Sequence, residues 1–148
     1  MSTGLFAGSF DPYTIGHDSV ARRAMRLFDR LVIGVGVNDA KHYRASAEER
    51  VKAIRELYKD MPQVEVVGYS DCTVDLAQRV GAEFIVKGVR NIRDYEYERD
   101  QAEINRMIGN VETVLLFTEP GLGSVSSSVV RELEKLGKPV EQFLPKRR

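Results

Sequence analysis

Short apolar runs alternate along the chain with longer stretches in which apolar residues recur at helical spacing. The expected strands cover residues 5–7, 31–37, 64–67, 84–86 and 111–117. Between them, side chains such as Val51, Ile54 and Leu57 fall on one face of a predicted helix. Ser46, followed three residues later by Glu49, predicts the capped start of that helix. Further helices are expected from residue 16, over 73–80, over about 92–108 and from residue 126.

Strands thus alternate with helices five times, and most strands are apolar throughout. That pattern is typical of a parallel sheet covered by helices on both faces. We therefore predict an α/β fold: one doubly wound, Rossmann-like, five-stranded parallel sheet, forming a single domain over residues 1–148. Ligands of such sheets bind at the carboxyl ends of the strands, so the loops that follow the strands are the candidate site.

Composition narrows the class of protein without naming a function. The 148 residues are 43% hydrophobic and 30% charged, as in ordinary globular proteins. The chain has 22 basic and 22 acidic residues, so its net charge gives no reason to expect a nucleic acid or a membrane as partner. The single Cys72 excludes an internal disulfide, and no apolar run is long enough for a membrane span. We expect a cytoplasmic protein.

The first strand-end loop reads GSFDPYTIGH, residues 8–17. Gly8 permits close approach of the backbone to a ligand, and Ser9 offers a hydroxyl group. Gly16 and His17 open the next helix, where free N–H groups and the helix dipole favour an anion. His17 is open to two interpretations: it caps or packs at the helix start, or it donates a ring N–H to a phosphate. The Asp-Pro pair at 11–12 is interpreted as turn chemistry.

Cations and hydroxyls collect in the other strand-end loops. Lys41, His42 and Arg44 follow the second strand, either as a solvated patch or as ligands of an anion. The loop KGVRNIR, residues 87–93, follows the fourth strand, and its first residue, Lys87, is expected to have an anionic partner. Three serines, 126–128, begin the last helix and exceed what capping requires. Tyr95 and Tyr97 are expected to pack in the core or between helices.

No other chemistry has a clear motif in the sequence. The sequence lacks a Gly-x-x-x-x-Gly-Lys-Ser/Thr loop and a Gly-x-Gly-x-x-Gly turn. It also lacks Cys and His at metal-ligand spacing and a strong nucleophile–base pair. Cations, hydroxyls and helix N-termini at one sheet edge are suited to holding phosphates by position and electrostatics. Phosphoryl and nucleotidyl transfer are catalysed largely in that way.

Two of these segments carry a family resemblance. GSFDPYTIGH resembles the Gly-Ser/Thr-Phe-Asp-Pro…Thr/His-x-Gly-His signature of the nucleotidyltransferase superfamily, and VSSSVVRE resembles its second signature. KGVRNIRDYEYE is more specific, because it resembles a block of the phosphopantetheine adenylyltransferase family. The likeness extends over residues 4–145. It implies transfer of the adenylyl group of ATP to 4′-phosphopantetheine, giving dephospho-coenzyme A and pyrophosphate, with Mg²⁺ entering on ATP and no metal site in the protein.

The resemblance also implies roles for single residues. His17, Lys41 and Arg90 would be catalytic, with His17 holding the α-phosphate in the transition state. Residues that would bind ATP are Ser9, Phe10, His17, Gly88, Val89, Arg90, Glu98, Gly123, Ser124, Val125, Ser126, Ser127, Ser128 and Val129. Residues that would bind phosphopantetheine are Ser9, Lys41, Thr73 and Lys87. Members of the family are usually homohexamers inhibited by coenzyme A.

The sequence departs from the family pattern in three places. Lys87 stands where the family usually has arginine, which keeps the charge and loses the bidentate geometry. The loop PGLGSV lacks the aromatic residue often found there, and the chain ends at FLPKRR, a basic tail expected to be solvated. Two alternatives remain open: a sibling enzyme acting on nicotinamide mononucleotide or a polyol phosphate, and an ATP-binding module without catalysis.

Overall fold

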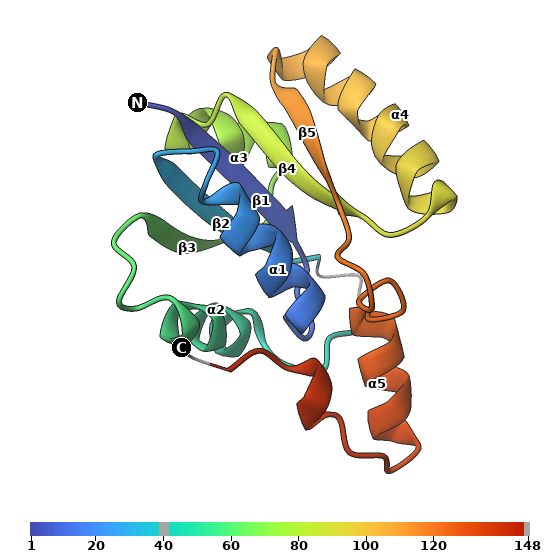
Figure 1. The fold of residues 1–148 in the computed structure, drawn as a ribbon. Helices are drawn as coiled ribbons and strands as arrows, with labels where there is room; N and C mark the ends of the chain where they lie inside the picture. The colour runs from blue at the N-terminus through green and yellow to red at the C-terminus, as the bar shows by residue number, and fades with distance from the viewer. Residues whose placement is uncertain (39–41, 147–148) are drawn as a thin grey trace.

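The computed structural model describes residues 1–38 and 42–146 (Figure 1). The strands are β1 (Thr3–Gly8), β2 (Arg30–Gly36), β3 (Val64–Tyr69), β4 (Phe84–Val89) and β5 (Glu112–Phe117). The helices are α1 (Ile15–Ala24), α2 (Ala47–Leu57), α3 (Thr73–Val80), α4 (Ile92–Gly109) and α5 (Ser127–Lys135), followed by the short 3₁₀ turn η1 (Glu141–Phe143). The predicted alternation of strands and helices is confirmed, because each predicted apolar run overlaps one strand, with only Val37 and Val111 lying just outside β2 and β5.

All neighbouring strands of the sheet are parallel, and their order is β3-β2-β1-β4-β5. Leu5 of β1 lies in register with Val32 on one side and with Ile85 on the other. The chain extends the sheet in one direction from β1 to β3 and then crosses back to β4. The switch point therefore lies between β1 and β4, where a doubly wound sheet leaves a crevice for a ligand.

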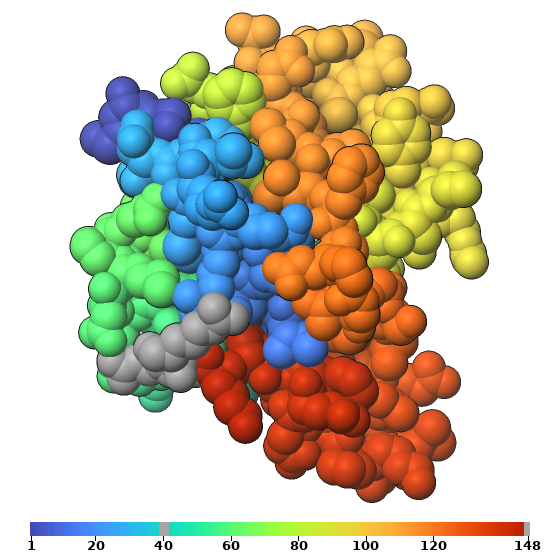
Figure 2. All heavy atoms as spheres, viewed as in Figure 1, coloured from blue at the N-terminus to red at the C-terminus, as the bar shows by residue number. Residues whose placement is uncertain are grey.

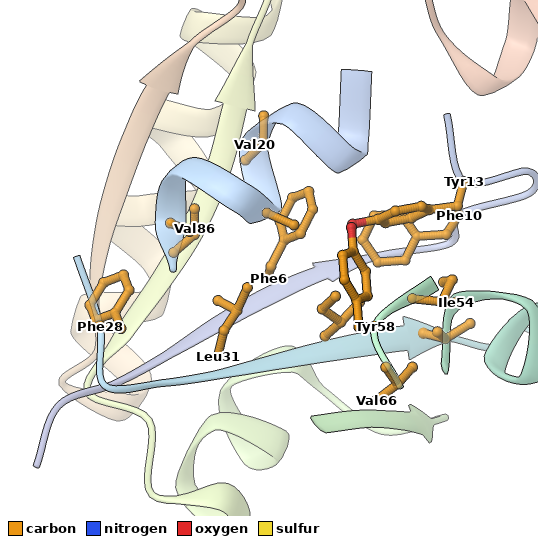
Figure 3. Packing of buried hydrophobic residues seen from close by; sticks show 14 residues of the cluster. Phe6, Phe10, Tyr13, Val20, Phe28, Leu31, Ile54, Tyr58, Val66 and Val86 are labelled. Carbon is orange, nitrogen blue, oxygen red and sulfur yellow. The ribbon is translucent and has the colours of Figure 1, made fainter. Parts of the chain in front are cut away.

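Each face of the sheet carries its own hydrophobic core, because β1 and β2 alternate their side chains between two buried faces. Phe6 and Ile33 pack with residues of α1 and α2, such as Val20 and Ile54, and Figure 3 shows part of this cluster. Leu5, Val32 and Ile85 point the other way and pack with residues of α3 such as Leu76. The predicted doubly wound α/β fold with helices on both faces is confirmed.

Two details refine the sequence-based expectation. β4 continues to Val89, so Lys87 and Gly88 belong to the strand, paired with Leu115 and Leu116 of β5, and not to the following loop. α5 lies beyond the carboxyl ends of the strands, where hydrogen bonds join it to the first loop (Figure 1). Both elements thus bring side chains directly to the switch point.

The expectation that Tyr95 and Tyr97 pack in the core is wrong. The two side chains are 45% and 65% exposed, and among the eighteen residues of α4 only Glu98 is buried. α4 lies beside the edge strand β5, and no other element of the described chain covers its outer face (Figure 1). The helix consequently presents apolar residues to solvent.

Candidate active site

A cavity of about 340 Å³ lies at the carboxyl ends of β1 and β4, at the switch point. It is bordered by the loop after β1, the end of β4, the residue after β5 and the first turns of α1 and α5. Its lining residues are Phe6, Ala7, Gly8, Ser9, Phe10, Asp11, Thr14, Gly16, His17, Val20, Lys87, Gly88, Arg90, Glu98, Thr118, Leu122, Val125, Ser126, Ser127, Ser128 and Arg131. The cavity therefore lies among the strand-end loops that the sequence selects as the candidate site.

His17 caps its own helix through one ring nitrogen. Thr14 is the N-cap of α1, and its backbone N–H donates to Nδ1 of His17 at 2.9 Å. Because a backbone N–H can only donate, Nδ1 must be the unprotonated nitrogen of the neutral ring, and the proton lies on Nε2. The two interpretations of His17 are therefore compatible: Nδ1 serves the cap, and Nε2–H remains a donor for a ligand in the cavity.

Aromatic neighbours hold the His17 ring in a largely apolar setting. The ring of Phe10 meets it edge-on at 5.0 Å between centroids, and the ring of Tyr13 stacks on it at 5.4 Å. Burial and, to a smaller extent, the nearby positive charge of Arg90 together lower the pKa of His17 from its ordinary value of 6.5 to about 4. The ring is consequently neutral at pH 7 and acts as a hydrogen-bond donor without a charge of its own.

The first loop takes its shape from buried polar contacts. Phe10 has a φ of 50°, a left-handed conformation that non-glycine residues rarely adopt. The buried carboxylate of Asp11 accepts from the backbone N–H of Arg44 at 2.6 Å and of Ala45 at 3.1 Å. The Asp-Pro turn is thus scaffolding, and it joins the first loop to the end of the loop after β2. Gly8 lines the cavity, and a Cβ there would lie 2.9 Å from the Phe10 ring, so glycine permits the close packing of that ring on the backbone.

A buried arginine on α2 supports the same two loops and was not identified from the sequence. Arg50 is 3% exposed, and its Nη1 donates to the carbonyl oxygens of Ser9 at 2.6 Å and Gly36 at 3.1 Å. Its Nε donates to the carbonyl of Ala45 at 3.1 Å. In the sequence Arg50 lies in the charged run AEER, which reads as a solvated helical face. Only the folded chain brings three carbonyl groups to it.

The end of β4 brings two cations to the cavity, each with a carboxylate on α4. Nζ of Lys87 lies 3.2 Å from the buried carboxylate of Glu98, which is the anionic partner expected from the sequence. Nε of Arg90 lies 3.0 Å from Asp94, one turn along the chain. Gly88 lies between them, where a Cβ would come within 2.8 Å of Val20, so this glycine permits close packing of α1 on β4.

The three serines of α5 each have a different partner. Ser126 is the N-cap and accepts from the N–H of Val129, whereas the hydroxyl of Ser127 donates to the carbonyl of Pro12 at 2.7 Å. The hydroxyl of Ser128 accepts from Nη2 of Arg131 at 3.2 Å. Nη1 of Arg131 donates to the carbonyl of Asp11 at 2.7 Å. Ser127 and Arg131 therefore attach α5 to the first loop, and Arg131 adds a cation that the sequence reasoning had not singled out.

The cavity brings together most of the residues that the sequence selected. Those that line it are Ser9, Phe10, His17, Lys87, Gly88, Arg90, Glu98, Val125, Ser126, Ser127 and Ser128. Those that do not line it are Thr73, Val89, Gly123, Ser124 and Val129. Lys41 lies outside the described residues. Thr73 begins α3, and its hydroxyl is hydrogen-bonded to that of Tyr69 at 2.9 Å.

The site combines positive charge with two helix N-termini. Lys87, Arg90 and Arg131 supply three cations, and α1 and α5 both begin at the cavity. The two lining carboxylates, Asp11 and Glu98, are engaged by backbone N–H groups and by Lys87. Such an arrangement can hold several phosphate groups and stabilise negative charge that develops among them.

The cytidylyltransferase-like family model matches residues 5–133 of the chain. Taken with the parallel sheet and the phosphate-binding character of the cavity, this match places the protein in the nucleotidyltransferase class. A crystal structure of a Vibrio parahaemolyticus protein assigned as a nicotinate-nucleotide adenylyltransferase has the same fold, with a TM-score of 0.67 over 99% of this chain and 95% of that one. At 19% sequence identity, that likeness concerns the fold alone.

Closer relatives identify the family. Phosphopantetheine adenylyltransferases of Bacteroides thetaiotaomicron and Bacteroides fragilis are 48% and 47% identical over 98% and 99% of this chain, and over 96% and 97% of their own lengths. The enzyme of that name from Leuconostoc citreum is 44% identical over 99% of this chain and 93% of its own length. The chain belongs to the phosphopantetheine adenylyltransferase family.

Proposed function

We propose that the protein transfers the adenylyl group of ATP to 4′-phosphopantetheine, releasing pyrophosphate and forming dephospho-coenzyme A. The observation that carries this proposal is the neutral His17 ring, whose Nε2–H is the free donor beside three cations at the switch point. Membership of the family, at 40–48% identity to proteins of that name, favours phosphopantetheine over nicotinamide mononucleotide or a polyol phosphate as acceptor.

The reaction requires positioning and charge stabilisation more than proton transfer. An oxygen of the acceptor phosphate attacks the α-phosphorus of ATP, and the bond from that phosphorus to the pyrophosphate oxygen breaks. The attacking phosphate is already ionised near neutral pH, so a general base has no task. Three sets of donors would stabilise the negative charge that accumulates on the transferring and leaving groups. They are Nε2–H of His17, the side chain of Arg90 and the N–H groups at the start of α5. Lys87 would bind the acceptor phosphate.

The ligand-binding roles of Lys41 and Thr73 and the binding of Mg²⁺ are also proposals. Lys41 would add a cation to the reacting phosphates, and Thr73 would contact the pantetheine arm from the start of α3. Among the described residues, no group of three or more His, Cys, Asp or Glu side chains could hold a metal ion. We infer that Mg²⁺ enters on the phosphates of ATP, where it neutralises part of their charge.

A panel of acceptors tests the proposed function. The purified protein is incubated with ATP, Mg²⁺ and either 4′-phosphopantetheine, nicotinamide mononucleotide or glycerol phosphate, and pyrophosphate release is measured. We expect turnover with phosphopantetheine alone. Turnover with another acceptor but none with phosphopantetheine would refute the proposal.

Replacing His17 separates an enzyme from a module that only binds ATP. In His17→Ala, we expect kcat to fall about 10²- to 10³-fold, as when one preorganised donor to a developing charge is removed. The Kd for ATP, measured by calorimetry, should change far less, because His17 donates chiefly in the transition state. An equal loss of affinity and turnover would instead favour the binding module.

We also propose that the protein assembles as a homohexamer, with α4 and β5 in a subunit interface. Ile104, Met107 and Ile108 of α4 are 49%, 73% and 61% exposed, and Phe117 at the end of β5 is 76% exposed. α4 and β5 lie side by side along one edge of the molecule (Figure 2). A second copy of this chain would bury these side chains, and a helix with so few buried residues needs such packing for stability.

Regulation and location complete the proposal. Coenzyme A carries the pantetheine arm of the reaction product, so we propose it as a feedback inhibitor that competes for the acceptor subsite. None of the described helices is both long and apolar enough to cross a lipid bilayer. We propose the cytoplasm, where ATP is abundant, as the site of the reaction.

A further inference from the structure

A buried chain of polar side chains lies directly behind the His17 ring. The hydroxyl of Tyr13 is 2.8 Å from that of Tyr58, and the Tyr58 hydroxyl donates to Oδ1 of Asp18 at 2.5 Å. Nε of Arg22 donates to both oxygens of Asp18, at 3.1 and 3.0 Å. Tyr13, Tyr58 and Asp18 are all at least 94% buried, and Figure 3 shows the two tyrosine hydroxyls meeting.

The direction of these hydrogen bonds follows from the charge at one end. Asp18 is paired with Arg22, so its carboxylate accepts from Tyr58. The Tyr58 oxygen is then free to accept, and the Tyr13 hydroxyl donates to it. Burial raises the pKa of both tyrosines, so both hydroxyls keep their protons at any physiological pH. Tyr13 is therefore held at its hydroxyl end by a series of hydrogen bonds that ends in the ion pair of Asp18 and Arg22.

The other end of Tyr13 holds His17. The rings of Tyr13 and His17 stack at 5.4 Å between centroids, with an angle of 28° between their planes. The ring of Phe10 packs against the His17 ring in an edge-on arrangement. The N–H of Thr14 fixes Nδ1. With these three contacts in place, the Nε2 edge is the part of the imidazole left to face the cavity. A small rotation of Tyr13 would therefore redirect the donor.

Stability alone gives little reason for such a network. A buried ion pair with two buried hydroxyls costs desolvation, and apolar residues of similar volume would stabilise the fold about as well. Hydrogen bonds that join buried polar side chains do, however, fix those side chains in one arrangement. We propose that Tyr13 is a positioning residue for His17, and that Tyr58, Asp18 and Arg22 hold Tyr13 in place so that Nε2–H points at the transferring phosphate. The inference rests on the proposed function of the site.

Two substitutions of Tyr13 test the inference. Tyr13→Leu removes the stacked ring, and we expect kcat to fall about 10- to 100-fold, with the KM for ATP changing less than about twofold, because a donor displaced by about 1 Å loses transition-state contact first. Tyr13→Phe keeps the ring and loses the hydroxyl contacts to Tyr58 and to the carbonyl of His17, so kcat should fall by a smaller factor, about threefold to tenfold. An unchanged kcat in Tyr13→Leu, or a loss that lies wholly in KM, would overturn the inference.

A double-mutant cycle distinguishes positioning from general damage. Adding Tyr13→Leu to His17→Ala should lower kcat by less than about twofold, because the residue that Tyr13 positions is already absent. The matched control is Gln63→Met, which removes two partly buried hydrogen bonds to the carbonyls of Met25 and Phe28 away from the cavity. This control should lower Tm and leave kcat unchanged. If Tyr13→Leu lowers kcat equally with and without His17, the inference is wrong.

A readout without turnover separates this inference from the proposed function. The chain has two histidines, His17 and His42, so ¹⁵N signals of the His17 ring are assigned by comparison with His17→Ala. At pH 7.5 we expect one tautomer with the proton on Nε2, and a mixture of tautomers or broadened signals in Tyr13→Leu. Absence of any turnover in the wild type would refute the function and leave this result standing. Identical His17 signals in wild type and Tyr13→Leu would refute the inference alone.

Discussion

At the scale of single residues, His17 shows how one side chain serves structure and chemistry together. Its Nδ1 accepts from the N–H of Thr14, and that structural bond places the proton on Nε2, where a phosphate oxygen can accept it. Burial against Phe10 and Tyr13 keeps the ring neutral. Each feature is common by itself. Together they give a hydrogen-bond donor that is fixed in position and stays uncharged near pH 7.

The neutral state of His17 predicts a pH-dependent stability. Its pKa is about 4 in the folded chain and near 6.5 when exposed, so between these values the unfolded chain binds a proton that the folded chain does not. The free energy of unfolding should therefore fall as the pH is lowered from 6.5 towards 4, by on the order of 2–3 kcal/mol from this ring. Urea unfolding of the wild type and of His17→Gln at pH 7, 5.5 and 4.5 measures the effect. A difference between the two proteins that is the same at all three pH values would contradict it.

Lys87 gives a second prediction for a single side chain. Its Nζ forms one contact with Glu98 at 3.2 Å, whereas an arginine could contact Glu98 and still offer a planar pair of donors to a phosphate. We expect Lys87→Arg to lower the KM for phosphopantetheine about threefold to tenfold and to leave the KM for ATP unchanged. Steady-state kinetics with each substrate varied in turn checks this. An unchanged or higher KM for phosphopantetheine would count against the proposed role of Lys87.

At the scale of elements, the site is held by helices that attach to loops and not only to the sheet. α5 is joined to the first loop by Ser127 and Arg131, and α2 is joined to it by Arg50. Both connections end on carbonyl oxygens of Ser9, Asp11 or Pro12. These helices therefore fix the backbone that carries Ser9 and His17, although neither arginine needs to contact the reacting atoms.

Removal of the Arg50 side chain should damage stability and activity together. Arg50→Met leaves the buried carbonyls of Ser9, Gly36 and Ala45 without this donor, and we expect the free energy of unfolding to fall by about 2–4 kcal/mol. Turnover should fall as well, because the first loop loses its support. Lys52→Met on the exposed face of the same helix is the matched control and should change neither quantity. Equal stabilities of the two variants in urea would show that Arg50 has no such role.

At the scale of the whole molecule, the exposed apolar residues of α4 and β5 give the proposed assembly a direct test. Ile108→Glu places a charge within the proposed interface, and we expect smaller species than the wild type in sedimentation velocity at micromolar concentration. Lys59→Glu, on an exposed position of the turn after α2, is the control and should leave the assembly unchanged. A wild type that sediments as a monomer would refute the homohexamer.

The sequence by itself determined the fold and pointed to the candidate site. Unbroken apolar strands such as residues 31–37 must be buried on both faces, and helices between them must cover a parallel sheet, so the strand-end loops had to meet at one edge. Motifs within those loops selected His17, Lys87, Arg90 and the serines of α5. These inferences needed only local patterns and the rules that govern parallel sheets.

The tertiary structure decided what depends on partners far apart in the chain. Arg50 and Arg131 are ordinary charged helical residues in the sequence, and only folding brings them to carbonyls 41 and 120 positions away. The bond from Tyr58 to Asp18 spans 40 positions, so the support of Tyr13 could not be read from a motif. The exposure of α4 likewise follows from its place beside the edge strand. Local pattern fixes which face of an element is apolar, whereas the partner of a buried polar group is set by the packing of the whole chain.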